Sequence, residues 1–109
     1  MEIQSKKIDL QGFKFFILQD GKEIARSFLY ILKNDLHEKP FGFLEDVFVD
    51  ESYRGKGLGT KIIEEVIKAA KENSCYKLIC TSRHENEKVH DLYLKLGLEK
   101  HGLEFRINF

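Results

Sequence analysis

Apolar residues in the first half of the chain form runs that are typical of β-strands. Aromatic and aliphatic residues dominate positions 13–18, 24–32 and 42–49, and polar residues separate these runs. Asp20-Gly21 lies between the first two runs, and this pair favours the tight turn of a β-hairpin because both residues tolerate a positive φ. The polar segment 34–40 predicts a loop. We therefore expect three strands, the first two of them joined as a hairpin.

The second half of the chain changes to a helical period. Apolar residues recur three and four positions apart from Leu58 to Ala70, with charged residues on the other side. This pattern predicts a helix that ends near Asn73, a residue that tolerates the left-handed conformation common at helix ends. Three more elements are expected: a strand over 76–81, a helix over 89–96 stopped by Gly97, and a terminal strand over 103–109.

The order of these elements predicts the fold class. Antiparallel strands come first, and a β-α-β unit follows them. This order indicates a mixed α/β (α+β) fold with one mostly antiparallel sheet and helices packed on it. The length of 109 residues is that of one ordinary domain, which we expect to span 1–109.

Composition and charge narrow the classes of function. The chain has 18 basic and 18 acidic residues, so its formal net charge is zero, and we expect no nucleic-acid or membrane partner. Its histidines and cysteines lack the spacing of metal ligands, so no metal is expected. We see no apolar signal region and no apolar run near the roughly 18 residues of a membrane span. A cytoplasmic protein is expected.

The segment between the third strand and the first helix is the most informative. It reads Arg54-Gly55-Lys56-Gly57-Leu58-Gly59-Thr60. Alternating glycines permit tight turns, and a helix N-terminus presents unpaired amides that suit a phosphate or pyrophosphate. The nucleotide P-loop does not fit, because Gly57 follows Lys56 where Ser or Thr is needed. The dinucleotide fingerprint does not fit either, because Thr60 stands where it requires glycine. A plain tight turn before a helix is the alternative.

The pattern Arg/Gln-x-x-Gly-x-Gly/Ala fits this segment at every defined position. It resembles the coenzyme A loop of the GNAT superfamily of acetyl-CoA-dependent N-acetyltransferases. The segment 86–98 is similar to the second signature of that superfamily, Asn-x-x-Ala-x-x-x-Tyr-x-x-x-Gly-Phe, with Val89 in place of Ala and Leu98 in place of Phe. The resemblance covers residues 42–109 and implies the GNAT fold.

Some segments resemble one enzyme of the superfamily in particular, and one segment differs from the superfamily pattern. Segments such as Leu44-Glu45-Asp46-Val47 also look like glucosamine-6-phosphate N-acetyltransferase, whereas Thr81-Ser82-Arg83 resembles microbial GNAT proteins of other kinds. Superfamily members carry two helices between their first two strands, and the segment 6–12 is too short to hold them. We therefore expect a GNAT fold that is shortened at its N-terminus, with an acceptor side that is open or completed by a second subunit.

The resemblance implies how acetyl-CoA, the co-substrate, is held. Its pyrophosphate would lie on the backbone amides of the glycine loop, and Asn86 would bind the coenzyme or simply cap the second helix. Its pantetheine arm would pair with the third strand as an added strand does. The expected binding residues are Val47, Phe48, Val49, Arg54, Gly55, Lys56, Gly57, Leu58, Gly59, Thr60, Asn86 and Tyr93.

The resemblance also implies the catalytic groups. Glu45 would accept a proton from the amine or bind the acceptor, or it is an exposed carboxylate without a role. Its neighbour Asp46 should face the other side of the sheet, since side chains alternate along a strand. A backbone N–H near Val47 or Phe48 would stabilise the oxyanion. Tyr93 would protonate the leaving thiolate, or it is a core tyrosine.

These expectations combine into one activity. We expect an N-acetyltransferase that moves acetyl from acetyl-CoA to a primary amine, first of all a small molecule such as an amino sugar, by direct attack in a ternary complex. The alternatives are a peptide or protein N-acetyltransferase and a non-catalytic acyl-CoA-binding module. A homodimer formed through the apolar terminal strand is a further hypothesis.

Overall fold

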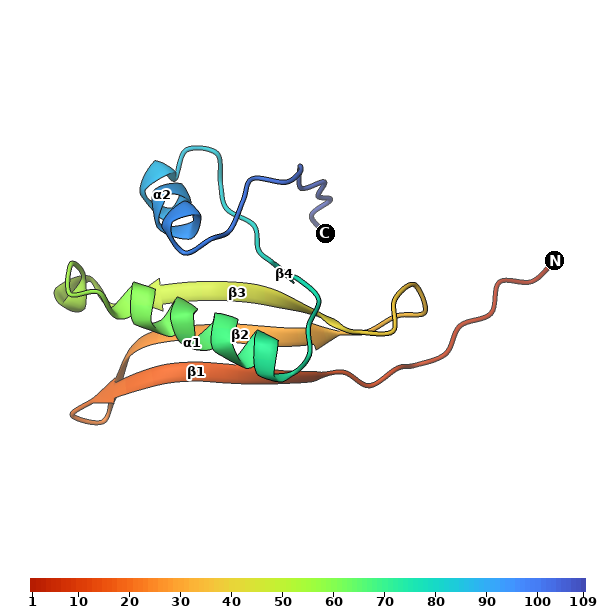
Figure 1. The fold of residues 1–109 in the computed structure, drawn as a ribbon, viewed down its shortest axis with the longest axis horizontal. Coiled ribbons are helices and arrows are strands. Elements are labelled where there is room, and N and C mark those ends of the chain that lie inside the picture. Colours follow the sequence, from red (N-terminus) through yellow and green to blue (C-terminus); the bar gives the residue numbers. More distant parts are fainter. The chain divides into compact units, whose positions relative to one another are not determined.

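Four strands and one long helix build residues 1–79 (Figure 1). The strands are β1 (Gln11–Gln19), β2 (Lys22–Leu32), β3 (Phe41–Val49) and β4 (Leu78–Ile79), and they lie in this order in one sheet. The first three are antiparallel, and β4 pairs with β3 in parallel. A 3-10 turn, η1 (Glu51–Tyr53), and helix α1 (Leu58–Glu72) lead from β3 to β4. The mixed, mostly antiparallel sheet predicted from the sequence is confirmed.

The computed structural model describes all residues from 1 to 109. They divide into two compact units, Met1–Ile79 and Cys80–Phe109, and each unit is described by itself. The second unit holds helix α2 (Glu87–Lys95) and no strand. The single domain expected over 1–109 stays a prediction.

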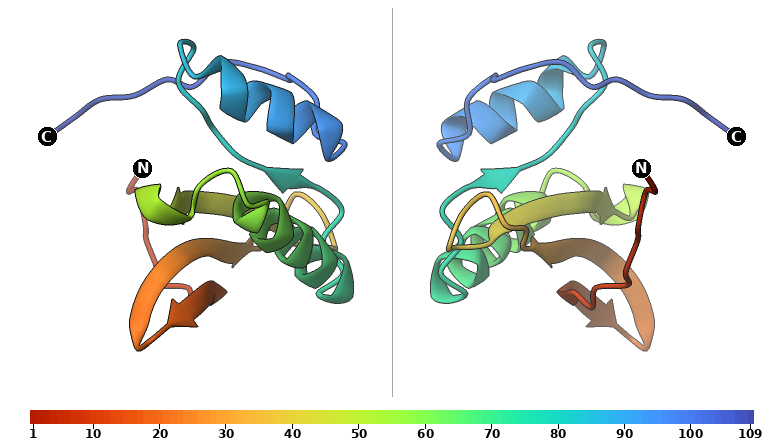
Figure 2. Two further views of the ribbon diagram at one scale, coloured as in Figure 1. Left: turned by 90° about the vertical axis from the view of Figure 1, so that its left-hand side faces the viewer. Right: turned by 90° about the vertical axis from the view of Figure 1, so that its right-hand side faces the viewer.

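Helix α1 covers one face of the sheet in the first unit (Figure 2). Its apolar stripe and the alternate residues of β2 and β3 form the core of this unit. The fully or almost fully buried apolar side chains are Ile24, Ala25, Leu29, Ile31, Leu44, Ile62, Ile63, Val66 and Ala70. Gly42 allows a close approach here, because an added Cβ would lie 2.9 Å from the Leu78 side chain and 3.0 Å from that of Leu29.

The hairpin and the helix ends follow the sequence with one exception. Asp20 and Gly21 have φ values of 52° and 77°, as the predicted turn requires. Helix α1 ends at the predicted place, but Asn73 is not left-handed, and its side-chain amide instead donates to the Ala69 carbonyl at 2.8 Å. The left-handed residue is Ser74, with φ 61°. Gly97, with φ 97°, follows helix α2 as predicted.

Two strand predictions need correction. The strand expected over 76–81 is reduced to Leu78–Ile79, because only these residues pair with β3. The terminal strand expected over 103–109 is wrong: this segment has no regular structure, and Phe105 is 90% exposed. Alternating apolar residues form a strand only where a neighbouring strand completes the backbone hydrogen bonds, and none does so here. The strand through which a homodimer was expected to form is therefore absent, and the homodimer stays a prediction.

No helix of the structure has the length and apolar character needed to cross a membrane.

Candidate functional site

The glycine loop adopts a backbone that only glycine adopts easily. Gly55 and Gly57 both have φ 79°, and a Cβ added to either would meet nothing within 4 Å. Conformation rather than space therefore requires glycine at these two positions, and the loop surface above them is open. Gly57 is the N-cap residue of helix α1, and no side chain caps this end of the helix. The first amides of α1 therefore remain available to an external anion.

Polar contacts fasten the start of this loop to the sheet. The Asp50 amide donates to the Ile24 carbonyl of β2 at 2.7 Å, and the Asp50 side chain accepts from the Ser52 amide at 3.0 Å. Bonds from Lys22 and Ser52 hold the pKa of the Asp50 carboxyl below its usual range. Arg54 donates from Nε to the Val49 carbonyl at 2.9 Å. The loop is thus held at a fixed distance from the end of β3.

Strand β3 has an unpaired edge just before this loop. On one side it pairs with β2 as far as Val49. On the other side β4 pairs only with Gly42 and Phe43. One edge of β3 between residues 44 and 49 therefore has no strand partner, and it leads directly to the open glycine loop. Such an edge offers backbone donors and acceptors to an extended ligand.

A β-bulge interrupts β3 within the same stretch. Arg26 pairs with Phe48 and Phe28 pairs with Glu45, so Ser27 of β2 stands opposite two residues, Asp46 and Val47. Asp46 adopts a left-handed backbone conformation, with φ 55°, which accommodates the extra residue of the bulge. The buried Ser27 hydroxyl donates to the Glu45 carbonyl at 3.1 Å. This bond satisfies a carbonyl at the point where the regular ladder is broken.

Ser27→Ala should lower the free energy of unfolding by about 1–3 kcal/mol, because it leaves the Glu45 carbonyl at the bulge without its donor. Urea denaturation measures this change. The exposed Ser82→Ala serves as the control and should change stability by less than about 0.5 kcal/mol. Equal effects of the two substitutions would contradict the role given to the Ser27 hydroxyl.

The bulge also corrects the predicted placement of the two carboxylates. The sequence places Glu45 and Asp46 on opposite faces, but both are exposed on the face that carries Arg26 and Phe28. Arg26 donates from Nε to Asp46 at 2.8 Å, and this bond raises the pKa of the guanidinium. The Glu45 carboxylate has no hydrogen bond or ion pair within the chain. Of the two carboxylates, Glu45 is the one without a partner in the chain.

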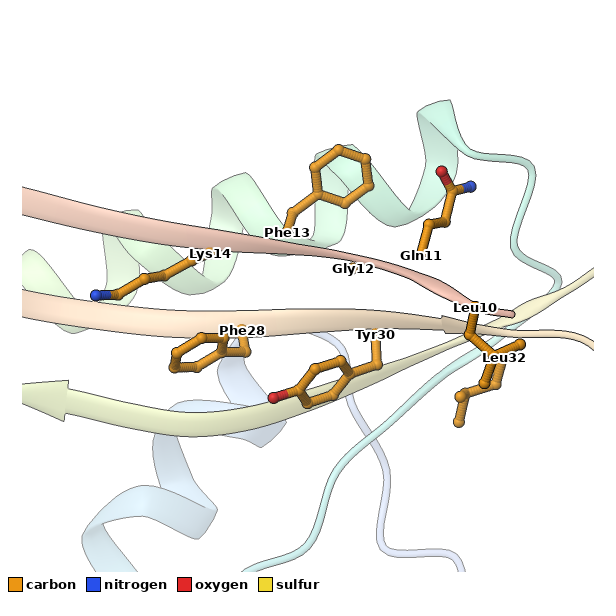
Figure 3. A pocket seen from close by; sticks show the side chains of 8 residues that line it. All are labelled: Leu10, Gln11, Gly12, Phe13, Lys14, Phe28, Tyr30 and Leu32. Atoms are coloured by element: carbon orange, nitrogen blue, oxygen red, sulfur yellow. The ribbon is translucent and has the colours of Figure 1, made fainter. Parts of the chain in front are cut away.

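A shallow hollow lies on this same face, against the Phe28 and Tyr30 side chains (Figure 3). The rings of Phe28 and Tyr30 stack with centroids 6.1 Å apart, and Lys14 reaches over Phe28 at 5.9 Å. Glu45 pairs with Phe28, so it stands between the hollow and the end of β3 that leads to the glycine loop. The lining residues are Leu10, Gln11, Gly12, Phe13, Lys14, Phe28, Tyr30 and Leu32.

The second unit holds the other two predicted site residues. Tyr93 lies on α2 and is partly buried, and burial, with a smaller effect of Cys80, raises its pKa to about 12. Its hydroxyl is therefore protonated at neutral pH. Asn86 stands at the N-cap position of α2, but its side chain makes no capping bond. His90 places Nε2 2.8 Å from the Arg83 carbonyl, which indicates a structural contact.

The structure adds residues that the sequence did not single out. Arg26 and Ser27 hold the bulge, and Phe28 and Tyr30 line the hollow. No motif marks them, because their importance comes from the pairing of β2 with β3. The one available signal was Glu45-Asp46 itself, two adjacent carboxylates inside an otherwise apolar strand.

Comparison with known proteins agrees with the fold and the motifs. Residues 2–98 match the model of the Acetyltransferase (GNAT) family. The chain is 40% identical over 67 residues to the glucosamine 6-phosphate N-acetyltransferase of Trypanosoma brucei brucei, covering 62% of this chain and 44% of that protein. It is 34% identical over 90 residues to the enzyme of the same name from Candida albicans, covering 82% of this chain and 58% of that one. The narrower resemblance seen in the sequence is thus confirmed.

Solved structures agree with these relatives. The crystal structure of glucosamine-6-phosphate N-acetyltransferase from Arabidopsis thaliana superposes with a TM-score of 0.80 at 30% identity, covering 90% of this chain and 67% of that one. The chain spans about half the length of the curated relatives described above. The match of the family model over most of the sequence shows that the chain belongs to the Acetyltransferase (GNAT) family.

Proposed function

We propose that this protein is an acetyl-CoA-dependent N-acetyltransferase that acetylates the primary amine of a small molecule by direct attack in a ternary complex. The observation that carries the proposal is the unpaired edge of β3, which runs into an open glycine loop at a helix N-terminus. Family membership and relatives named for an amino-sugar acceptor support it. A cytoplasmic location fits the two free thiols, Cys75 and Cys80.

The proposal assigns binding of acetyl-CoA to two parts of the first unit. The pyrophosphate lies on the loop amides from Arg54 to Thr60, with Lys56 nearby over the Tyr53 ring. The pantetheine arm pairs with the free edge of β3. Asp50 directs its amide to β2, and the Val49 carbonyl accepts from Arg54 instead. Because backbone direction alternates along a strand, Val47 and Val49 present their backbone groups to the free edge, and Phe48 presents its own to β2.

Three groups then perform the transfer. Glu45 takes a proton from the amine, directly or through water, so that the nitrogen lone pair can attack the thioester carbonyl. The Val47 N–H stabilises the oxyanion of the tetrahedral intermediate. When the C–S bond breaks, the Tyr93 hydroxyl gives its proton to the leaving thiolate. The nitrogen gives up its second proton, which returns through solvent to the Tyr93 phenolate, and an amide and free coenzyme A result. Asn86, whose side chain makes no capping hydrogen bond to α2, binds the coenzyme.

Direct attack is favoured over an acetyl-cysteine intermediate by the state of the thiols. Burial raises the pKa of both Cys75 and Cys80, so each is a poor nucleophile near neutral pH. The double variant Cys75→Ala, Cys80→Ala should keep kcat within about threefold. Intact-mass spectrometry after incubation with acetyl-CoA alone should show no acetylated protein. An acetylated cysteine that forms and decays at the turnover rate would contradict direct attack.

The proposed activity is tested by the release of coenzyme A in the presence of candidate acceptors. Glucosamine 6-phosphate is the first acceptor to try, and glucose 6-phosphate, which lacks the amine, is its matched control. We expect release with at least one small primary amine and none with the control. Saturable acetyl-CoA binding without release for any small amine or peptide would overturn the proposal and favour a non-catalytic acyl-CoA-binding module. Release only with peptides would favour the peptide alternative.

A further inference from the structure

The Arg26 side chain contacts three residues around the bulge. It donates to Asp46 at 2.8 Å and to Glu23 at 3.5 Å, and its guanidinium carbon lies 4.5 Å from the centre of the Phe48 ring. Glu23 is itself held by Lys14 of β1. Charged contacts therefore run across three strands and end on the one residue of β3 that is left-handed. Asp46 is also directly followed by Val47, the proposed oxyanion donor.

We propose that Arg26 is a positioning residue, which acts through Asp46 to fix the bulge and thereby the direction of the Val47 N–H and the Glu45 carboxylate. This inference rests on the proposed function of that site. Asp46 then serves as the anchor of the bulge and not as the base. The reaction needs Glu45 and Val47 to be aimed from one short stretch of backbone, and a bulge is the feature that re-aims neighbouring residues.

The physical argument follows from the backbone of Asp46. A left-handed φ of 55° is unfavourable for a residue with a side chain, although Asp tolerates it better than most. A contact that exists only when Asp46 is left-handed shifts the equilibrium towards this conformation. The bond to Arg26 is such a contact, because Arg26 is already oriented by Glu23 and by Phe48. Loss of the bond allows β3 to sample registers in which Val47 points elsewhere.

Two substitutions at one position separate this role from direct chemistry. Asp46→Gly removes the carboxylate but suits the left-handed conformation, whereas Asp46→Ala removes the carboxylate and disfavours that conformation. We expect Asp46→Gly to keep kcat and KM for acetyl-CoA within about threefold of the wild type, and Asp46→Ala to lower kcat/KM about 10- to 100-fold. Equal losses in both variants would overturn the proposal, since the carboxylate itself would then be needed.

Arg26 is tested in the same way. Arg26→Gln should lower kcat about tenfold in the wild-type background and have little effect in the Asp46→Gly background, where no anchor is needed. Arg26→Lys, which keeps a donor for Asp46, should restore part of the activity. Independent losses from Arg26→Gln and Asp46→Gly that multiply in the double variant would contradict the coupling.

A measurement without substrate separates this inference from the proposed function. In hydrogen-exchange experiments on the free protein, the Phe48 amide, which is directed to β2 just after the bulge, should lose protection in Arg26→Gln and Asp46→Ala, but not in Asp46→Gly. This result would support the positioning role even if no amine were acetylated. Unchanged protection of the Phe48 amide in all three variants would overturn it even if the wild-type protein were active.

Discussion

Gly59→Glu should weaken acetyl-CoA binding at least about 100-fold while leaving the protein as stable as before or more stable. Gly59 lies in the first turn of α1 without a positive φ, and an added Cβ would make only an ordinary contact with Val49 at 3.7 Å. A glutamate there favours the helix by up to about 1 kcal/mol, through its propensity and its position near the positive end of the helix dipole. It also places a negative charge where the pyrophosphate is proposed to lie.

The rise in melting temperature on addition of acetyl-CoA measures this effect. At a ligand concentration of about 100 times Kd, the wild-type protein should gain about 2.7 kcal/mol, which is several degrees for a chain of this size. Gly59→Glu should gain at most about 0.4 kcal/mol under the same conditions, a small part of the wild-type rise. The matched control is Gly102→Glu, where an added Cβ meets nothing within 4 Å, and it should behave like the wild type. A full rise in Gly59→Glu would place the coenzyme elsewhere.

Tyr93→Phe should lower kcat about 100-fold or more with little change in KM for acetyl-CoA, because it removes the proton that the leaving thiolate needs. The pKa of about 12 means that the Tyr93 proton is present throughout the neutral and mildly alkaline range. In the wild type, the step that depends on Tyr93 should therefore not weaken as the pH rises from about 8 to about 10. Steady-state kinetics of both proteins over this range measure the effect.

Tyr76→Phe is the matched control for this substitution. Tyr76 lies in the first unit, and its ring contacts His37 and Phe41, so loss of its hydroxyl should leave kcat unchanged.

The raised pKa of Tyr93 also predicts that the free energy of unfolding depends on pH, since the folded state holds the Tyr93 proton more tightly than the unfolded state does. This contribution is complete below about pH 10 and is lost as the pH rises towards 12. A Tyr93→Phe variant with full kcat would remove Tyr93 from the mechanism.

Elements with a strong local pattern were predicted well. The apolar stripe of α1 repeats over four turns, and the Asp20-Gly21 turn depends on two residues only. The glycine loop was recognised because its residues are consecutive and its backbone demands are local. The terminal segment shows the limit of such patterns, since Leu103, Phe105 and Ile107 alternate correctly but have no strand to pair with.

The part of the site that the sequence did not predict depends on contacts between strands. Simple alternation placed Glu45 and Asp46 on opposite faces. The bulge places both on one face, because Ser27 and Arg26, distant in sequence, hold the extra residue in place. Neither residue carries a local signal of this role. The register of β2 against β3, which the structure supplies, therefore decides which face of the sheet these two carboxylates share.

The claim that residues 54–60 form a coenzyme A site is tested most directly by calorimetric titration of acetyl-CoA into the wild-type protein. Every step of the proposed transfer requires this binding. The account predicts saturable binding with one site per chain, which weakens as the salt concentration rises because it depends on phosphate contacts. A titration without saturable heat, repeated at a second temperature to exclude a vanishing enthalpy, would contradict the account.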